Sequence, residues 1–240
     1  MSNYKDLFQN YDALVFCYVR TTGADVYACQ IIELAAVRFV IDREKGKILN
    51  GGQIDRKIKL LPGVHLPRKI ADYLHLTEDN LEKNGLYEID VADEFKKMLK
   101  ASEKTLVIAH HGQMTFGFIT HMFYRFGYTH FQDDFDLLDT KTVLADRKPG
   151  NGNLTAAFEA YGLKEKKTDG TGLGEVKKLA YVALKMDEER ADLCRYINVF
   201  ATPNPNGLHR NMTLQKITYL PQTACESIRP EEEILPAKAV

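Results

Sequence analysis

The stretch that decides the fold is residues 13–23, which read ALVFCYVRTTG. Its first seven residues are apolar or strand-forming types, and the Thr-Thr-Gly at its end is typical of a turn. The pattern therefore predicts a buried strand over residues 13–19 that ends in a turn. A second apolar run, IIELAAVRFVI at residues 31–41, predicts a second strand.

Four charged residues followed by glycine at 42–46 (DREKG) predict a tight turn, and residues 47–61 then alternate loosely between polar and apolar types. This alternation predicts a third strand with Ile54, Ile58 and Leu60 as its inward positions. Strands joined by short turns pair with their neighbours. We therefore expect three consecutive antiparallel strands.

The remaining elements follow from the spacing of apolar residues along the rest of the chain. We expect strands at 105–109, 135–138 and 213–220, helices at 91–99, 113–126, 153–161 and 173–186, and a helical turn capped by Thr77. This order predicts an α/β domain over residues 1–197, with a mixed sheet flanked by helices. Residues 198–240 are expected to form a C-terminal extension with one strand and a solvated tail.

The composition excludes several classes of protein. Of the 240 residues, 45% are hydrophobic and 27% charged, which excludes a disordered tail, a collagen and a coiled coil. The 32 basic and 33 acidic side chains give a net charge of −1, which excludes a polycation. The four cysteines form no CxxC pair, so we expect buried free thiols. No apolar run is long enough to span a membrane, and the N-terminus has no apolar signal core. A cytoplasmic protein without a membrane partner is therefore expected.

Five short segments, in this order and spacing, resemble the DnaQ-like (DEDDh) 3′–5′ exonuclease superfamily. They are residues 16–23 with 31–37, residues 74–77, residues 106–116, residues 138–140 with 153–155, and residues 170–180. The resemblance extends over roughly residues 11–187. It implies an RNase H-like fold, in which a mixed β-sheet is flanked by helices.

Exonucleases of this superfamily use four carboxylates to hold two Mg or Mn ions, and a histidine as general base. The resemblance places Tyr18, Arg20, Thr115 and Glu175 at the carboxylate positions and Gly170 at the histidine position. Glu175 alone is an anionic ligand. A fixed positive charge such as that of Arg20, about 4 Å from a divalent ion, costs roughly 8 kcal/mol at an effective dielectric of about 20. We therefore predict that the metals are lost as cofactors and that none of these residues is catalytic.

The same cleft also contains candidate nucleotide-binding residues. By resemblance, Thr21, Thr22 and Gly23 line the pocket for a terminal nucleotide. The guanidinium of Arg20 suits a phosphate, and the ring of Tyr18 suits stacking on a base or sugar. The alternative is that this cleft is not used at all.

Three further hypotheses concern neighbouring side chains. Phe116 is a candidate for nucleotide contact, although its helical spacing also predicts a core position. Arg20 and Glu175 are expected to form an ion pair in place of the contact between carboxylate and metal. A metal ligand relocated to another carboxylate is the remaining alternative, and the candidates are Asp25, Glu33, Asp139 and Asp169.

Together these expectations describe a catalytically degenerate, exonuclease-like protein. It would bind the end of a single-stranded nucleic acid or a partner protein, without two-metal hydrolysis. One alternative is an active 3′–5′ exonuclease on single-stranded DNA or RNA with a shifted metal site. Another is a pure protein-interaction module of phage or mobile-element origin. The choice between DNA and RNA and the oligomeric state stay open.

Overall fold

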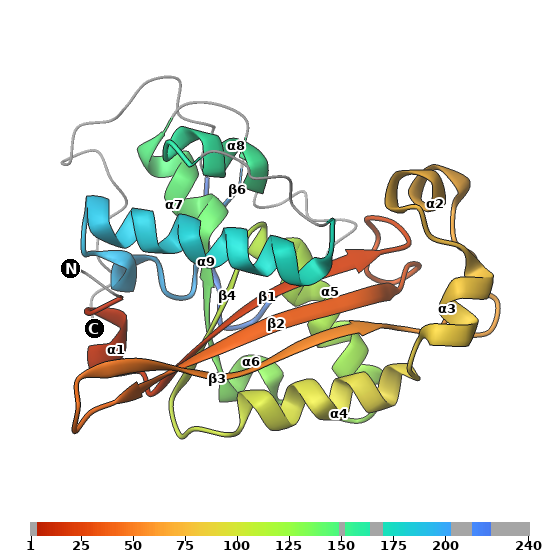
Figure 1. Cartoon of the computed structure of the whole chain (residues 1–240), viewed down its shortest axis with the longest axis horizontal. Helices are drawn as coiled ribbons and strands as arrows, with labels where there is room; N and C mark the ends of the chain where they lie inside the picture. The colour runs from red at the N-terminus through yellow and green to blue at the C-terminus, as the bar shows by residue number, and fades with distance from the viewer. Residues whose placement is uncertain (1–3, 149–151, 164–169, 203–212, 222–240) are drawn as a thin grey trace.

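The computed structural model describes residues 4–148, 152–163, 170–202 and 213–221. This part of the chain is built around one five-stranded sheet with the order β3-β2-β1-β4-β5 (Figure 1). The strands are β1 (Ala13–Thr21), β2 (Ile31–Asp42), β3 (Lys47–Lys57), β4 (Thr105–Ala109) and β5 (Asp136–Asp139). β1, β4 and β5 are parallel, and β2 is antiparallel to both β1 and β3. The predicted antiparallel start and the mixed sheet are therefore confirmed.

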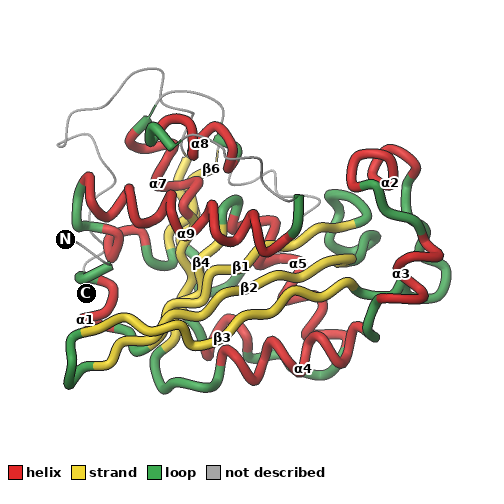
Figure 2. The backbone as a smooth tube through the Cα atoms, in the orientation of Figure 1, coloured by secondary structure: helices red, strands yellow, loops and turns green. Residues whose placement is uncertain are grey.

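The longer helices cover the two faces of this sheet (Figure 2). They are α4 (Glu88–Leu99), α5 (Gly112–Arg125), α7 (Thr140–Arg147) and α9 (Gly172–Glu189). The shorter ones are α1 (Leu7–Asn10), α2 (Arg68–Leu74), α3 (Glu78–Asn84), α6 (Phe131–Asp134), α8 (Leu154–Ala160) and the 3-10 helix η1 (Leu193–Tyr196). The predicted helices correspond to α4, α5, α8 and α9, and Thr77 caps α3 as predicted. The sequence analysis did not identify α1, α2, α6, α7 or η1.

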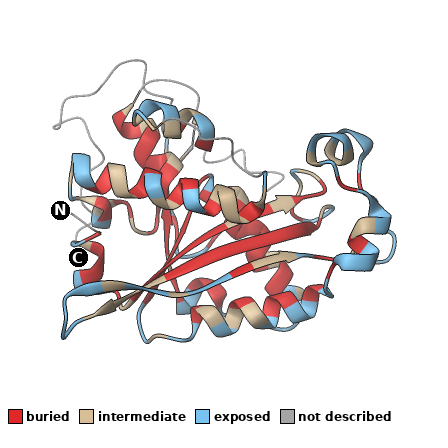
Figure 3. Ribbon diagram, in the orientation of Figure 1, coloured by how far each residue is buried: buried red, intermediate tan, exposed pale blue. Residues whose placement is uncertain are grey.

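The continuous apolar run of β1 is explained by burial on both faces of the sheet. Successive side chains of a strand point to opposite faces. Val15 and Cys17 accordingly pack against α4 and α5, whereas Leu14 and Phe16 pack under α9. The sheet centre is buried throughout, and β3 at its edge is largely exposed (Figure 3). Ile54 and Ile58 are buried as predicted, whereas Leu60 is only partly buried.

The described part of the C-terminal extension packs into the same core as the preceding domain. β6 (Val199–Thr202) and β7 (Thr218–Pro221) form a separate two-stranded parallel sheet. The strand predicted over residues 213–220 is thus shorter than expected, and it joins β6 rather than the main sheet. Phe200, Leu214 and Ile217 are buried in the core on the α5 side of the sheet. The solvated tail predicted after β7 lies outside the described residues.

No described helix combines the length and the apolar character needed to cross a membrane. Cys17, Cys29 and Cys194 are free thiols, and only Cys17 is fully buried. Cys225 lies outside the described residues.

Candidate functional site

The candidate site lies at the carboxyl end of β1, on the face of the sheet that α9 covers. Cross-strand register pairs Tyr18 with Ala35 and Arg20 with Glu33, so these side chains share one face. Helix α9 begins directly over these side chains. Its first residue, Gly172, lies so close to the sheet that an added Cβ would be 3.0 Å from the Cβ of Ala35 and 3.0 Å from Oε1 of Glu33. Glycine at this position therefore allows the close approach of α9 to the sheet.

Arg20 is held by three neighbours. Its Nη1 donates to Oε2 of Glu33 at 2.7 Å, and its Nη2 donates to the carbonyl oxygen of Gly170 at 2.8 Å. The guanidinium carbon lies 5.9 Å from the centre of the Tyr18 ring. Burial by itself lowers the pKa of Arg20, but the Glu33 carboxylate and the Tyr18 phenol outweigh burial, and the net pKa is raised. The guanidinium thus stays charged and fixed in place.

Glu33 links this arginine to the start of α9. It is 7% exposed, and both of its carboxylate oxygens are occupied. Oε2 accepts from Arg20, and Oε1 accepts from the backbone N–H of Gly172 at 3.0 Å. The carboxylate also complements the positive end of the helix. One side chain therefore binds both the strand and the helix of the site.

The predicted ion pair between Arg20 and Glu175 is wrong. Glu175 lies in the first turn of α9 and pairs with Lys178 at 3.0 Å, one turn further along the same helix. The side chain of Lys178 is only 6% exposed. Arg20 instead finds its carboxylate on the neighbouring strand. Among the described residues of the site, two positive and two negative side chains therefore form these two ion pairs.

Tyr18 lies half-buried beside these pairs. Burial is the main reason that the pKa of its phenol is raised; Arg20 opposes this rise and Glu175 adds to it. The phenol is therefore neutral at physiological pH. It can donate or accept a hydrogen bond, but it is not an anionic ligand.

The Thr-Thr-Gly turn after β1 is held by its own hydrogen bonds. The Thr21 hydroxyl donates to the carbonyl oxygen of Gly23 at 2.6 Å. Thr22 accepts the N–H of Gln30 on its hydroxyl oxygen at 3.0 Å, and its own N–H donates to the Gln30 carbonyl oxygen at 2.9 Å. A Cβ on Gly23 would lie 2.6 Å from Sγ of Cys29. The turn is thus tightly packed, with its hydroxyls bonded inside it.

Helix α5 carries Thr115 and Phe116, and both are buried. Phe116 is fully buried, with its ring 5.9 Å from that of Phe200. The prediction that Phe116 is a core residue is therefore confirmed. The prediction that it contacts a nucleotide is wrong, because no part of its ring reaches the surface. Of the described contacts, none joins Thr115 to Tyr18 or Arg20.

Three of the four carboxylates considered as relocated ligands have other partners among the described residues. Asp139 is 3% exposed and caps α7, where it accepts from the N–H of Lys141 at 2.9 Å. Asp25 accepts from the N–H of Tyr27 at 2.9 Å. Glu33 is bound to Arg20, and Asp169 lies outside the described residues.

Divalent metals prefer anionic oxygen ligands that are free to coordinate. In the described ranges, no three His, Cys, Asp or Glu side chains are grouped so that they could hold a metal ion. At the site itself each carboxylate already faces a cationic side chain. The donor set therefore does not fit a pair of divalent ions in this arrangement.

Sequence reasoning missed two residues, Glu33 as the partner of Arg20 and Lys178 as the partner of Glu175. The pair between Glu175 and Lys178 could have been predicted, because residues three apart on a helix are neighbours. The pair between Arg20 and Glu33 could not, because it depends on the register of β1 and β2. Buried His110 bonds Thr140 Oγ1 and the Gly152 carbonyl oxygen, each at 2.9 Å, and this indicates a structural role.

Comparisons with known proteins bear on this arrangement. The family model described as Exonuclease matches residues 21–169, more than half of the chain. The matched range includes the Thr-Thr-Gly turn and Thr115. It leaves out the substituted positions at its two ends, which are Tyr18, Arg20, Gly170 and Glu175. Comparison with curated proteins gives no match.

Solved structures with a similar fold include exonuclease I enzymes. E. coli Exonuclease I in complex with a dT13 oligonucleotide has a TM-score of 0.64 and 16% identity, over 76% of this chain and 42% of that chain. The moderately thermophilic Exonuclease I from Methylocaldum szegediense has a TM-score of 0.61 and 17% identity, over 75% and 41%. The chain thus corresponds to about two fifths of the length of these enzymes. At such low identity the likeness concerns the fold alone.

Proposed function

The chain belongs to the Exonuclease family, and from this we propose that it binds the end of a single-stranded nucleic acid without two-metal hydrolysis. The RNase H-like fold expected from the DnaQ-like resemblance is confirmed by the family match and by the likeness to Exonuclease I. The fold positions the side chains of the site, and the chemistry of those side chains decides what the site does.

The observation that carries the proposal is the closed pairing of both site carboxylates. Two-metal hydrolysis needs ligands that hold two cations about 3.5–4 Å apart. Here Glu33 and Glu175 each face a cation that is covalently part of the chain. An incoming metal would have to break both ion pairs and would still meet the charge of Arg20. The pairing therefore favours binding over hydrolysis.

The proposed ligand follows from the same residues. Arg20 presents a planar guanidinium, which suits phosphate oxygens, and Tyr18 presents an aromatic ring beside it. E. coli Exonuclease I has the same fold, and its structure contains a dT13 oligonucleotide. That likeness leads us to propose a single strand as the ligand. The packed turn at residues 21–23 would border its terminal nucleotide.

A single experiment distinguishes the alternatives. A fluorescently labelled single strand is incubated with the protein in Mg²⁺ or Mn²⁺, and both its length and its anisotropy are followed. We expect binding that weakens with salt, no shortening, and no thermal stabilisation by the metal alone. Shortening of the strand would overturn the proposal and favour a shifted metal site. Neither shortening nor binding would leave a protein-interaction module.

A matched pair of variants locates the binding. Arg20→Lys keeps the charge but loses the forked geometry, and we expect about tenfold weaker binding. The control is Arg56→Lys, because Arg56 likewise donates two hydrogen bonds from its guanidinium, both to Glu94, but on the edge strand β3. An equal loss of binding in both variants would mean that the forked geometry of Arg20 does not locate the binding, and no loss in either would mean that positive charge alone is sufficient.

A further inference from the structure

Gln30 joins the Thr-Thr-Gly turn to the segment that follows β3. It is only 1% exposed. Its backbone N–H donates to Oγ1 of Thr22 at 3.0 Å, and its carbonyl oxygen accepts the Thr22 N–H at 2.9 Å. Its side-chain Nε2 donates to the Lys59 carbonyl oxygen at 2.7 Å, and its Oε1 accepts the Leu61 N–H at 2.8 Å. One buried residue therefore ties together two segments that are far apart in the sequence.

An amide suits these two side-chain partners better than other side chains of its size. Lys59 presents an acceptor and Leu61 presents a donor, so position 30 must supply one donor and one acceptor next to each other. An ionised carboxylate has only acceptors, and an apolar side chain has neither group. Loss of the amide would therefore leave both backbone groups without this partner.

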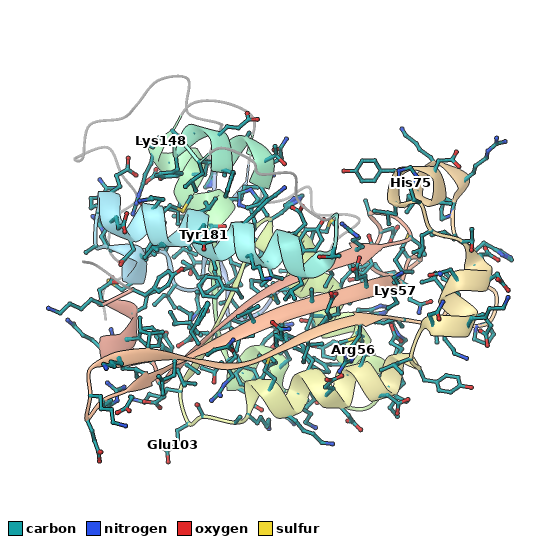
Figure 4. The ribbon with its side chains drawn as sticks, viewed as in Figure 1. Arg56, Lys57, His75, Glu103, Lys148 and Tyr181 are labelled. Atoms are coloured by element: carbon teal, nitrogen blue, oxygen red, sulfur yellow. The ribbon has the colours of Figure 1, made fainter. Side chains whose placement is uncertain are left out.

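Residues 62–76, which we call the α2 arm, follow this segment and lead away from the sheet. None of the residues of α2 is buried. Leu66 and Leu76, one before and one after the helix, share a small apolar cluster with Ile32 of β2. The helix is followed by His75, whose φ is +50° and which stands clear of the sheet (Figure 4). Because the helix of the arm buries no side chain, the position of the arm depends on how its two ends are held.

The α2 arm lies beyond the carboxyl end of β1, where the candidate site is (Figure 1). Tyr73 of α2 is 83% exposed. Burial is the main cause of the raised pKa of Tyr18, and the phenol of Tyr73 also contributes to this rise. An electrostatic influence of this kind weakens with distance, so the arm borders the same space as Tyr18.

The terminal nucleotide that we place at the Thr-Thr-Gly turn would therefore be bordered by the α2 arm as well. Gln30 is bonded to both borders, through its backbone to Thr22 and through its amide to the residues that precede the arm. The distance between the two borders thus depends on this residue. A strand without an end has no terminal nucleotide to place between them.

We propose that Gln30 is a positioning residue that gives the site its preference for the end of a strand. Its amide holds the start of the α2 arm at a fixed distance from Thr22, so that the turn and the arm border the same terminal nucleotide. Gln30 acts through these two segments and does not itself contact the nucleic acid. The inference rests on the proposed function, in which the turn borders the end of a single strand.

The test compares a labelled linear single strand with a circular one of the same sequence, by anisotropy, on the full chain. We expect the wild-type protein to bind the linear strand at least about tenfold more tightly than the circular one. Gln30→Met keeps an unbranched side chain of similar length but removes the amide, and it should bind the two strands within about twofold of each other. A variant that keeps the wild-type preference would overturn the proposal.

Gln30→Glu provides a conservative rescue. Burial raises the pKa of a carboxyl group at such a position, so at about pH 5 the side chain is protonated and again has one donor and one acceptor. At this pH we expect Gln30→Glu to keep the preference for the linear strand within about threefold of the wild-type value, whereas Gln30→Met loses it. Equal loss in both variants would show that the hydrogen bonds of the amide are not the cause.

Gln132→Met is the matched control. Gln132 is also a buried glutamine, 5% exposed, and its Oε1 accepts the N–H of Gln215 at 2.6 Å, which ties α6 to the C-terminal extension. We expect this variant to lose stability and to keep the preference for the linear strand. If it lost the preference as Gln30→Met does, the cause would be general loosening of the fold and the proposal would be wrong.

Amide exchange in the wild-type chain gives a readout that does not depend on the folding of any variant. The N–H of Leu61 is bonded to Gln30 at the start of the α2 arm. We expect the linear strand to slow exchange at Leu61 and the circular strand to leave it unchanged. Unchanged exchange at Leu61 with the linear strand bound would contradict a role of this bond in recognising the end.

Failure of this inference is distinguishable from failure of the proposed function. If the wild-type protein binds neither strand, or binds both equally, the proposed binding of a strand end is wrong and the role of Gln30 falls with it. If the wild-type protein prefers the linear strand and Gln30→Met does so too, the proposed function stands and the inference about Gln30 alone is overturned.

Discussion

Arg20 and Glu33 face each other across the antiparallel pair β1–β2, with 2.7 Å between Nη1 and Oε2, and the second oxygen of Glu33 accepts the first backbone N–H of α9. The Glu33 carboxylate therefore joins strand β1, through Arg20, to the first residue of helix α9. In the sequence the pair is separated by 13 positions, whereas Gly170, which accepts from the same arginine, is 150 positions away.

Replacing Glu33 by Gln should destabilise the protein. The change leaves the charge of Arg20 without its counter-ion, and the side chains of the pair are only 17% and 9% exposed. We expect a loss of about 2–4 kcal/mol in the free energy of unfolding. The control is Glu94→Gln at the more exposed pair with Arg56, which should cost less than about 1 kcal/mol. Equal losses in urea denaturation would show that the Arg20 pair is not the stronger constraint.

Stability should fall when the solution is acidified through the histidine range. Burial lowers the pKa of His110 from its ordinary value near 6.5. The unfolded chain then binds a proton at His110 more readily than the folded chain does. The contribution is full above the unfolded pKa of about 6.5 and is lost as the pH falls towards the lower folded pKa. Unfolding measured from about pH 7 to about pH 5 should show this loss, and His110→Asn should reduce it without abolishing it, because burial also lowers the pKa of His111 and of His121.

Restoring the family residues should create a metal site if the positional correspondence is right. The change comprises Tyr18→Asp, Arg20→Glu, Thr115→Asp, Gly170→His and Glu175→Asp. We add Lys178→Ala to these five changes, because the ammonium of Lys178 forms an ion pair with the carboxylate at position 175 and would compete with a metal ion for it. We expect calorimetric Mn²⁺ binding with all six changes, and weaker binding when Lys178 is kept. If the sixfold variant stays folded and binds no metal, the correspondence is wrong.

Gly170→His is the least favourable of these changes. Gly170 has φ at +67°, a conformation that side-chain-bearing residues rarely adopt. We therefore expect this substitution alone to lower stability by about 1 kcal/mol. Gly170→Ala should cost a similar amount, because the space around its Cβ is open and the backbone is the cause. A neutral result for both in thermal unfolding would contradict this.

The packing of the Thr-Thr-Gly turn can be tested through Cys29. In Gly23→Ala the new methyl group would lie 2.6 Å from Sγ of Cys29. We expect a cost of about 1 kcal/mol, since the sulfur has to move. Adding Cys29→Ala should recover most of the loss. If the double variant is as unstable as the single one, the contact with sulfur is not the cause.

The sheet and its helices were predictable where burial imposes a pattern. The run at residues 13–19 is apolar because β1 is covered on both faces, and Thr77 is a cap because it precedes two acidic residues. Helix α7 was missed because it begins at Thr140, directly after β5, so Asp139 both ends a strand and caps a helix.

The charges of the site were less predictable than its position. The resemblance directed attention to Glu175 as the partner of Arg20, but the register of β1 and β2 places Glu33 opposite that arginine. Register depends on the pairing of whole strands, and a shift of one residue would have turned Glu33 to the other face. The pair between Glu175 and Lys178 is local, and helical spacing could have indicated it.

The clamp formed by Arg20, Glu33 and the start of α9 has a consequence for how the cleft depends on its surroundings. A metal ion that organises a cleft is exchangeable, so the order it creates varies with ion concentration and disappears in a chelator. A guanidinium tethered to its own strand cannot be diluted or removed. We therefore expect the arrangement of Arg20, Glu33 and the start of α9 to be the same in a chelating buffer as in a magnesium-rich one, because it is set when the chain folds.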